Sequence, residues 1–574
     1  MKKQEKKFVL AGLALLAITG LLALAGCKND TVPEPTRYTV KFDKNAEDAS
    51  GEMQSQIFTE GVEQELSVNQ FKRDTYTFSG WSEDKAATAP TYKDKAKFKA
   101  TKDTTLYAVW TDNGTVAPVT FTPAGGALYY GNTVTLSSQE GATIHYTVNG
   151  GEEKNGASPV TVSVTGDTTI TAKATKDGLK PSDATTATYT VRKLEGITVT
   201  TLPAQTVYSE RQSFDPTGMV VTATYDDKSQ REVTGWETDF NTVAGEKGLN
   251  KPVTVSYTEG ETPKTTTFTV TVFPAEVKVL TGYTSSHAPE GEWTYVAFGK
   301  WPQSEAPGVN PTQVTPRSEN LFKDKYYFDA NGEYVKEGDK YYKVEPIVWR
   351  VLTTNYEAPE GGTVGEILLL AESILTGGIR YYVETKQRTI GGKPVYSNNW
   401  QYSTIRAWLN GLDVVKSDDT QENDTTYTDK GFLQTAFTQS AQDLIELTTV
   451  NNTAASTFGT GENTRDNPYT CDNTKDKIFL LSQQEATESK YGFDAYSDRD
   501  IARIRVTTDY AKATEAYQSL EEGYGGWWWL RSPRYNYEDT ARVINENGNA
   551  SVSYLVDNTI GGVVPALSIS LGGN

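Results

Sequence analysis

Residues that could perform covalent or metal chemistry are few and far apart in this sequence. The 574 residues include two cysteines, Cys27 and Cys471, and two histidines, His145 and His287. Zinc sites need several Cys or His ligands at short spacings, and a Ser-His-Asp triad needs a histidine within reach of its nucleophile. The two histidines are far apart in sequence and have no metal-ligand spacing, so both sites are poorly supported and the sequence predicts no catalytic residue, no metal site and no cofactor.

Near the C-terminus, a row of aromatic side chains offers a different chemistry. Trp527, Trp528 and Trp529 are consecutive and are followed closely by Arg531. Successive strand residues face opposite sides of a sheet, so the three rings cannot form one stacking surface. We therefore expect the three tryptophans to anchor the fold. We expect Arg531 to bind a carboxylate or backbone carbonyls inside the domain.

The segment after the tryptophans is rich in Tyr and Asn. Adaptable binding loops combine rigid aromatic area with flexible hydrogen-bonding groups. The predicted ligand-binding residues are Arg534, Tyr535, Asn536, Tyr537, Asp539, Asn547 and Asn549. Ordinary polar turns at a solvated edge have the same composition, so both interpretations stay open. A pair of carboxylates for glycoside hydrolysis is also open, since the chain has 74 acidic residues.

The elements that position these residues are mostly strands. Abundant Thr, Val and Tyr with frequent Gly and Asn turns predict a mostly β, multidomain protein. A hairpin is expected from 541–544 and 551–556. Three short helices are also expected. The first covers 403–410 and is capped by Ser403. The second starts near Ser440 with Leu444, Ile445 and Leu447 turned inward, and the third starts at the capping box of Ser482 and Glu485.

The N-terminus has the three regions of an export signal. Basic residues precede an apolar stretch from Phe8 to Ala25, which ends in Leu24-Ala25-Gly26-Cys27. That ending resembles a bacterial lipobox, which implies cleavage before Cys27 and lipid attachment to its sulfur. Residues 1–26 are therefore the expected signal peptide and 27–37 a linker. An acylated Cys27 would anchor the chain to a lipid membrane without a spanning helix.

The net charge and the cysteine content limit which binding partners and which disulfides we expect. Removing residues 1–26 deletes four lysines and one glutamate, which takes the formal charge from −19 to −22. A phosphate backbone needs a basic face, so no nucleic-acid partner is expected. With Cys27 acylated, Cys471 has no thiol partner within the chain.

Three small modules follow the linker. The segments 38–43, 76–81 and 104–110 resemble, in order and spacing, the Listeria–Bacteroides (internalin B-type) repeat, which implies a β-grasp-like module over 38–112. Residues 113–192 resemble the chitobiase/β-hexosaminidase C-terminal β-sandwich, which accompanies carbohydrate enzymes without being catalytic. Residues 193–275 resemble the group 3 bacterial Ig-like domain, a second sandwich. These families imply spacer modules, so we expect a stalk.

The remaining residues, 276–574, resemble the DUF6273 domain of bacterial surface lipoproteins. The resemblance rests on motifs at 298–303, 346–352, 403–410, 477–482, 528–533 and 564–567. That domain is similar to the α+β, C-type-lectin-like fold of formylglycine-generating enzymes and of variable binding proteins. Those enzymes use paired cysteines with copper, and Cys471 stands alone, so their activity is not expected. In the variable proteins the ligand surface lies at the end that corresponds to 534–539.

These observations predict a lipid-anchored lipoprotein of the cell envelope, on the outer-membrane surface, with its periplasmic face as the alternative. Its expected role is to display a lectin-like, adhesin-type domain on a stalk, with a host protein or a glycan as ligand. A glycan-active envelope enzyme and a purely structural surface protein are the alternatives.

Overall fold

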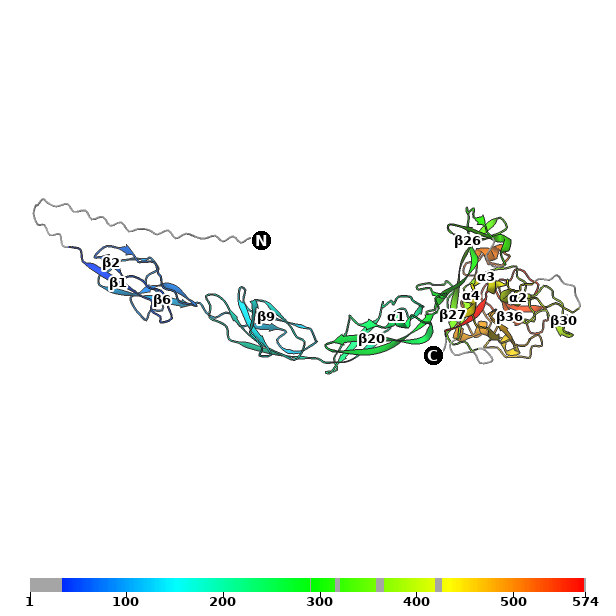
Figure 1. The fold of residues 1–574 in the computed structure, drawn as a ribbon, viewed down its shortest axis with the longest axis horizontal. Coiled ribbons are helices and arrows are strands. Elements are labelled where there is room, and N and C mark those ends of the chain that lie inside the picture. The colour runs from blue at the N-terminus through cyan, green and yellow to red at the C-terminus, as the bar shows by residue number, and fades with distance from the viewer. Residues whose placement is uncertain (1–33, 290, 315–320, 358–365, 419–425, 572–574) are drawn as a thin grey trace, which may run out of the picture. The chain divides into compact units, whose positions relative to one another are not determined.

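The structure is a computed structural model that describes residues 34–289, 291–314, 321–357, 366–418 and 426–571. Strands take up 41% of the residues and helices 8%, which confirms the prediction of a mostly β protein. The chain divides into two compact units, residues 1–192 and 193–574. Figure 1 shows the fold as a ribbon. No helix in the described ranges is long and apolar enough to cross a membrane.

The first module of unit 1 is a small sheet closed over one tryptophan. Its strands pair in the order β2-β1-β6-β4, with β1 parallel to β6. Trp81 is fully buried, with ring centroids of Phe42 and Phe78 at 4.9 and 4.8 Å. A module this small depends on such rings for its stability. The strands are β1 Arg37–Asp43, β2 Gln56–Thr59, β3 Gln64–Glu65, β4 Tyr76–Ser82, β5 Lys97–Phe98 and β6 Thr104–Asp112.

The second module of unit 1 consists of two packed sheets. The orders β11-β10-β13-β14-β8 and β12-β9-β7 enclose a core of alternating residues such as Ile144, Ile170 and Tyr189. Alternation turns every second side chain inward, as a sandwich requires. The strands are β7 Thr120–Thr122, β8 Gly126–Leu128, β9 Thr133–Ser137, β10 Thr143–Val148, β11 Lys154–Ala157, β12 Val160–Ser163, β13 Thr168–Thr175 and β14 Thr185–Val191.

Unit 2 begins with another pair of sheets, ordered β15-β17-β18 and β16-β21-β20-β19. Strands β20 and β21 form a long hairpin, and Phe273 at its end joins the core of the following domain. The elements are β15 Leu194–Thr201, β16 Val207–Ser209, β17 Val220–Tyr225, β18 Gln230–Glu232, β19 Glu237–Thr238, α1 Phe240–Val243, β20 Gly248–Glu259 and β21 Thr262–Phe273.

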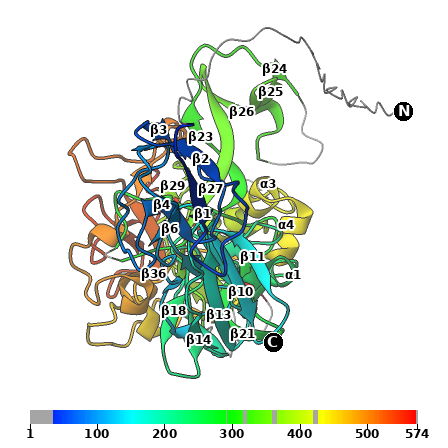
Figure 2. The same cartoon turned by 90° about the vertical axis from the view of Figure 1, so that its left-hand side faces the viewer.

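The C-terminal domain is built on one large sheet. Its described strands run β24-β25-β26-β27-β28-β39-β34, and β23 pairs with both β22 and β27. Figures 1 and 2 both show β24 to β26 projecting from the rest of the domain. The strands are β22 Lys278–Val279, β23 Tyr295–Glu305, β24 Thr312–Gln313, β25 Tyr326–Asp329, β26 Gly332–Glu337, β27 Lys340–Thr353, β28 Glu366–Ala371, β34 Ile478–Phe479 and β39 Ala566–Ser570.

Short ribbons and helices cover this sheet. A separate sheet of β36 Trp528–Pro533, β37 Thr540–Ile544 and β38 Ser553–Leu555 includes the predicted hairpin. The other ribbons are β29 Ser373–Ile374 with β35 Val506–Thr507, β30 Arg388–Ile390 with β31 Lys393–Val395, and β32 Thr448–Val450 with β33 Thr474–Asp476. The helices are α2 Thr404–Asn410, α3 Phe432–Ala436, α4 Gln439–Leu444 and α5 Asp509–Ala513, with 3₁₀ turns η1 Lys323–Lys325, η2 Ala454–Thr457, η3 Glu485–Thr487, η4 Ser489–Tyr491 and η5 Ile501–Arg503.

The predicted helices are confirmed in part. Helix α2 follows Ser403, whose Oγ accepts the Arg406 N–H at 3.2 Å. Helix α4 ends at Leu444, so Leu447 lies beyond it and is 59% exposed; its expected inward orientation is wrong. The capping box of Ser482 and Glu485 forms in both directions, but a 3₁₀ turn follows it in place of a helix.

Candidate functional site

The tryptophan strand lies at the base of the candidate site. Strand β36 pairs with β37, and Trp528 and Trp529 are fully buried in the domain core. The Trp528 indole N–H donates to the Arg503 carbonyl at 3.1 Å. Trp527 is half-buried, stacks on Tyr554 with ring centroids 4.4 Å apart, and packs at a tilt against Tyr517 with ring centroids 4.5 Å apart. The three rings therefore do not form one platform.

Arg531 is buried among acceptors of its own domain. Its Nη1 donates to the Leu480 carbonyl at 2.6 Å and to Glu485 Oε2 at 2.5 Å, and its Nη2 donates to the Asn451 carbonyl at 3.1 Å. Burial opposes ionisation of Glu485, but Arg531 together with hydrogen bonds from the Ser482 N–H and the Tyr356 hydroxyl outweighs it, so the pKa of Glu485 lies below its usual value. The guanidinium of Arg531 thus fixes β36 to the neighbouring loops.

The loop after β36 is held by buried polar side chains from elsewhere in the chain. Asn398 Nδ2 donates to the carbonyls of Tyr537 and Thr540 at 2.7 and 3.0 Å. Ser397 Oγ donates to the Glu538 carbonyl at 3.1 Å. Both side chains are fully buried, so the loop backbone has a defined position before any ligand arrives. Neither residue was predicted from the sequence.

A pocket of about 550 Å³ opens beside this loop. It lies among three segments that are far apart in the sequence. Its lining residues are Phe458, Gly461, Glu462, Asn463, Arg465, Tyr496, Arg534, Tyr535, Asn536, Tyr537 and Arg542. Its volume is in the range of small-molecule and saccharide sites.

Four of the seven predicted ligand-binding residues line this pocket, and three do not. Arg534 to Tyr537 line it, whereas Asp539, Asn547 and Asn549 are absent from its lining. The side chains of Asn547 and Asn549 accept hydrogen bonds from the backbone of their own turn. Side chains used in this way shape the turn between β37 and β38.

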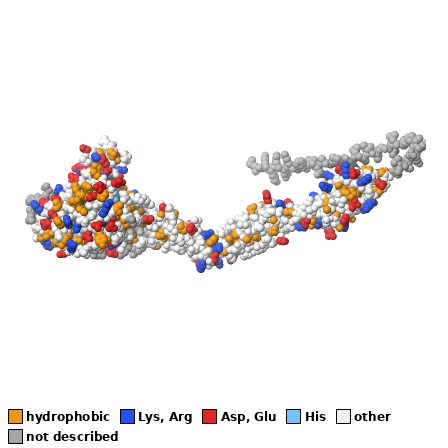
Figure 3. Space-filling view, turned by 180° about the vertical axis from the view of Figure 1, so that it is seen from behind, with side chains coloured by type: hydrophobic (Ala, Val, Ile, Leu, Met, Phe, Trp, Pro, Cys, Tyr) orange, Lys and Arg blue, Asp and Glu red, His pale blue; other side chains and the backbone are white. Residues whose placement is uncertain are grey.

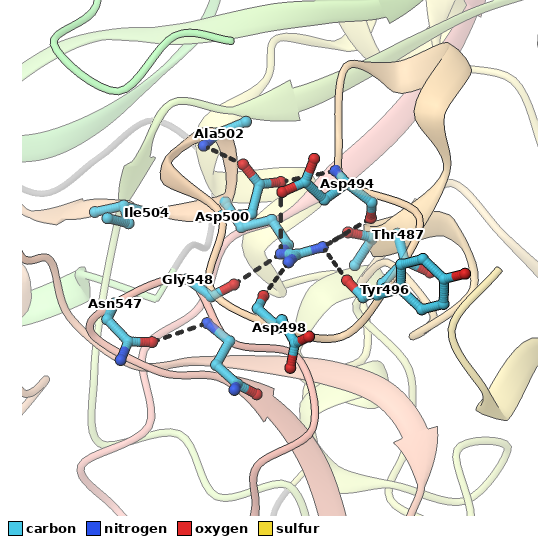
Figure 4. Close-up of polar contacts among 12 residues, drawn as sticks. Thr487, Asp494, Tyr496, Asp498, Asp500, Ala502, Ile504, Asn547 and Gly548 are labelled. Carbon is cyan, nitrogen blue, oxygen red and sulfur yellow. Dashed lines mark hydrogen bonds and ion pairs between the residues drawn. The ribbon is translucent and has the colours of Figure 1, made fainter. Parts of the chain in front are cut away.

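Apart from Arg542 on β37, the lining residues missed from the sequence come from two other loops. Tyr496 is 60% exposed, although the loop that carries it is tightly held. Arg503 is fully buried, and its guanidinium donates to the carbonyls of Asp494, Tyr496 and Gly548 at 3.1, 3.1 and 2.7 Å (Figure 4). Asp500 lies 3.7 Å from the same guanidinium. One cation thus positions the Tyr496 loop and the β37–β38 turn together.

Gly461 lets a second loop approach Tyr496. Its N–H donates to the Ala495 carbonyl at 2.6 Å. A Cβ at this position would lie 2.6 Å from the Tyr496 ring and 2.9 Å from that carbonyl. Only a residue without a side chain fits between the two loops.

The remaining chemical candidates are absent from the lining of the pocket or lie outside the described residues. Cys27 is outside them. Burial raises the pKa of the Cys471 thiol to about 11, which makes it a poor nucleophile. Across the ranges that the structure covers, no group of His, Cys, Asp and Glu could hold a metal ion.

Comparison with known families matches three stretches of the chain. Residues 38–109 match the Listeria-Bacteroides repeat domain, and residues 123–187 match the chitobiase/beta-hexosaminidase C-terminal domain. Residues 364–571 match DUF6273, a domain of unknown function, and include every residue of the pocket. Three of the four domain resemblances expected from the sequence are thus confirmed, and the resemblance of residues 193–275 to a group 3 bacterial Ig-like domain stays a prediction. The comparison with curated proteins gives no match. The matches indicate an extracellular multidomain protein.

Proposed function

We propose that this chain is a lipid-anchored binding protein of the bacterial cell envelope, and that its C-terminal domain takes a ligand in the pocket beside Tyr496 and Tyr535. The β modules of residues 38–275 serve as a spacer in this proposal. Acylation of Cys27 would attach the chain to the membrane.

The pocket itself carries the proposal. Tyr496 and Tyr537 are 60% and 46% exposed, although each is attached to backbone that buried side chains hold in place. Exposed aromatic rings on a fixed backbone lose little conformational entropy on binding. The chitobiase/beta-hexosaminidase match adds that carbohydrate enzymes carry a module like that of residues 123–187.

A glycan-cleaving enzyme at this pocket is disfavoured by its lining. Glycoside hydrolysis ordinarily needs two carboxyl groups that flank the scissile bond. Glu462 is the one carboxylate among the described residues that line the pocket.

The direct test is ligand capture by the soluble chain, residues 28–574, which keeps every described residue. It would be screened against an array of neutral and acidic glycans and against host extracellular-matrix proteins. Tyr496→Ala should weaken the binding that is found by about tenfold, because it removes a central aromatic contact. Tyr130→Ala is the matched control, since Tyr130 is 40% exposed and lies in residues 113–192. Equal binding by both variants would contradict the proposed site.

A further inference from the structure

The charge of the pocket is opposite to that of the chain. Three arginines line it, Arg465, Arg534 and Arg542, against Glu462 alone, whereas the chain as a whole carries −19. Figure 3 shows acidic and basic side chains interspersed over the face of the C-terminal domain that it presents. At physiological salt, charges farther away than about 8 Å are largely screened. The local arginines therefore determine which ligand charge is favoured in the pocket.

Arg542 is only partly satisfied by its own domain. Its Nη1 donates to the Ser551 carbonyl, while its Nε is buried and has no hydrogen-bond partner among the described residues. Burial and the neighbouring Arg534 lower the pKa of Arg542 to about 10. Two guanidinium groups that repel one another are stabilised when an anion binds between them.

The other two arginines lie against aromatic rings. The Arg465 guanidinium is 5.7 Å from the Tyr535 centroid, and Arg534 is 4.1 Å from the Tyr537 centroid. Arg534 Nη1 also donates to Ser553 Oγ at 3.0 Å. Stacking fixes the planes of these guanidinium groups and leaves further N–H donors for a ligand. The Phe458 ring supports Tyr535 from the pocket wall at 6.0 Å.

We infer that this pocket binds an anionic polysaccharide, with Arg465 and Arg542 contacting its carboxylate or sulfate groups and Tyr496 stacking on a sugar ring. This inference rests on the proposed function, to which it adds the chemical class of the ligand. Guanidinium groups form paired hydrogen bonds with either anion.

The lining favours a glycan over an acidic protein. Protein-binding patches have an apolar core, and no aliphatic side chain lines the pocket in the part of the chain that the structure describes. Arginine, asparagine and tyrosine match the hydroxyl groups, charges and flat faces of acidic sugars. The volume of about 550 Å³ admits a saccharide segment.

Matched polymers test the charge of the ligand without changing its backbone. Polygalacturonate is compared with its methyl ester, and dextran sulfate with dextran, in binding measurements on residues 28–574. The first pair tests for carboxylate and the second for sulfate, and poly-glutamate represents acidic peptides. We expect at least one charged glycan to bind about tenfold more tightly than its neutral counterpart, with an affinity that falls as salt is raised.

Variants of single arginines test which side chains contact the charged glycan. Arg465→Gln and Arg542→Gln should each weaken binding of the charged glycan by about tenfold, which is typical of the loss of one charge-assisted contact. Arg465 is exposed, so its variant keeps the test valid if Arg542→Gln fails to fold. Arg499→Gln is the control, because exposed Arg499 lies 5.0 Å from the Tyr524 ring and does not line the pocket.

The outcomes separate the inference from the proposed function. Equal binding of charged and neutral polymers, lost in Tyr496→Ala, would overturn the anionic class and leave the binding site intact. Tighter binding of poly-glutamate than of any charged glycan would overturn the assignment of the ligand as a glycan. Charged-glycan binding that neither arginine variant weakens would overturn the assignment of this pocket. If no glycan or protein binds at all, the proposed function itself fails.

Discussion

At the residue scale, the buried pair of Arg531 and Glu485 should contribute strongly to stability. Arg531→Met would leave Glu485 without its partner inside the domain, which should cost about 3–5 kcal/mol of unfolding free energy. Urea unfolding followed by the fluorescence of the buried tryptophans measures it. Lys512→Met is the control, since Lys512 and Asp509 form a half-exposed pair worth about 0.5 kcal/mol. Equal losses in the two variants would refute the importance of burial.

The same pair predicts a dependence of stability on pH. The folded pKa of Glu485 is lower than its unfolded value, near 4.3. Its contribution is therefore present above the unfolded pKa and is lost as pH falls through the folded pKa. Unfolding free energy measured from pH 6 downward should fall less steeply in Glu485→Gln than in the unchanged chain. Other carboxyl groups whose pKa is also lowered, among them Glu372 beside Arg505 and Arg350, supply the slope that remains. Equal slopes of unfolding free energy against pH in Glu485→Gln and in the unchanged chain would contradict this linkage.

At the element scale, Gly461 should control how the two loops beside the pocket fit together. Gly461→Ala would force the new Cβ against Tyr496 and the Ala495 carbonyl and weaken the hydrogen bond between the loops. Hydrogen–deuterium exchange at 459–462 and 494–498 should accelerate by about tenfold, as expected when one such bond is lost. Gly166→Ala is the control, because a Cβ there meets nothing within 4 Å. Unchanged exchange in Gly461→Ala would mean that the loops can separate freely.

Local signals in the sequence predicted the elements better than the site. Ser403 caps α2 as expected, because a cap depends on residues only three positions apart. The capping box at Ser482 also forms, but Glu485 is bound as well by Arg531 and by Tyr356, and the chain turns away after one 3₁₀ turn. Tertiary contacts thus limit this element to a single 3₁₀ turn. Helix propensity depends on the local sequence alone, so it cannot predict the effect of such contacts.

The pocket illustrates the same limit over longer distances. The Tyr and Asn composition of Arg534 to Tyr537 was visible in the sequence, and these residues line the pocket. The partners Arg465 and Tyr496 lie in loops whose positions depend on the buried Arg503 and on Gly461. No periodic pattern connects residues so far apart. Asn547 and Asn549 are of a residue type that also occurs in the pocket loop, yet their side chains accept hydrogen bonds from the backbone of their own turn.

At the scale of the whole molecule, the two cysteines provide an internal comparison for the proposed anchor. Cys27 ends the lipobox-like segment, whereas Cys471 lies in the C-terminal domain with a thiol pKa raised by burial. Cys27→Ser should move the protein from the membrane fraction to the soluble fraction of the cell, because acyl chains supply the proposed membrane affinity. Cys471→Ser should stay with the membrane. Fractionation and immunoblotting of both variants measure the difference, and protease added to intact cells then separates surface display from a periplasmic location. A Cys27→Ser protein that has lost residues 1–26 and still stays on the membrane would refute lipid anchoring at this residue.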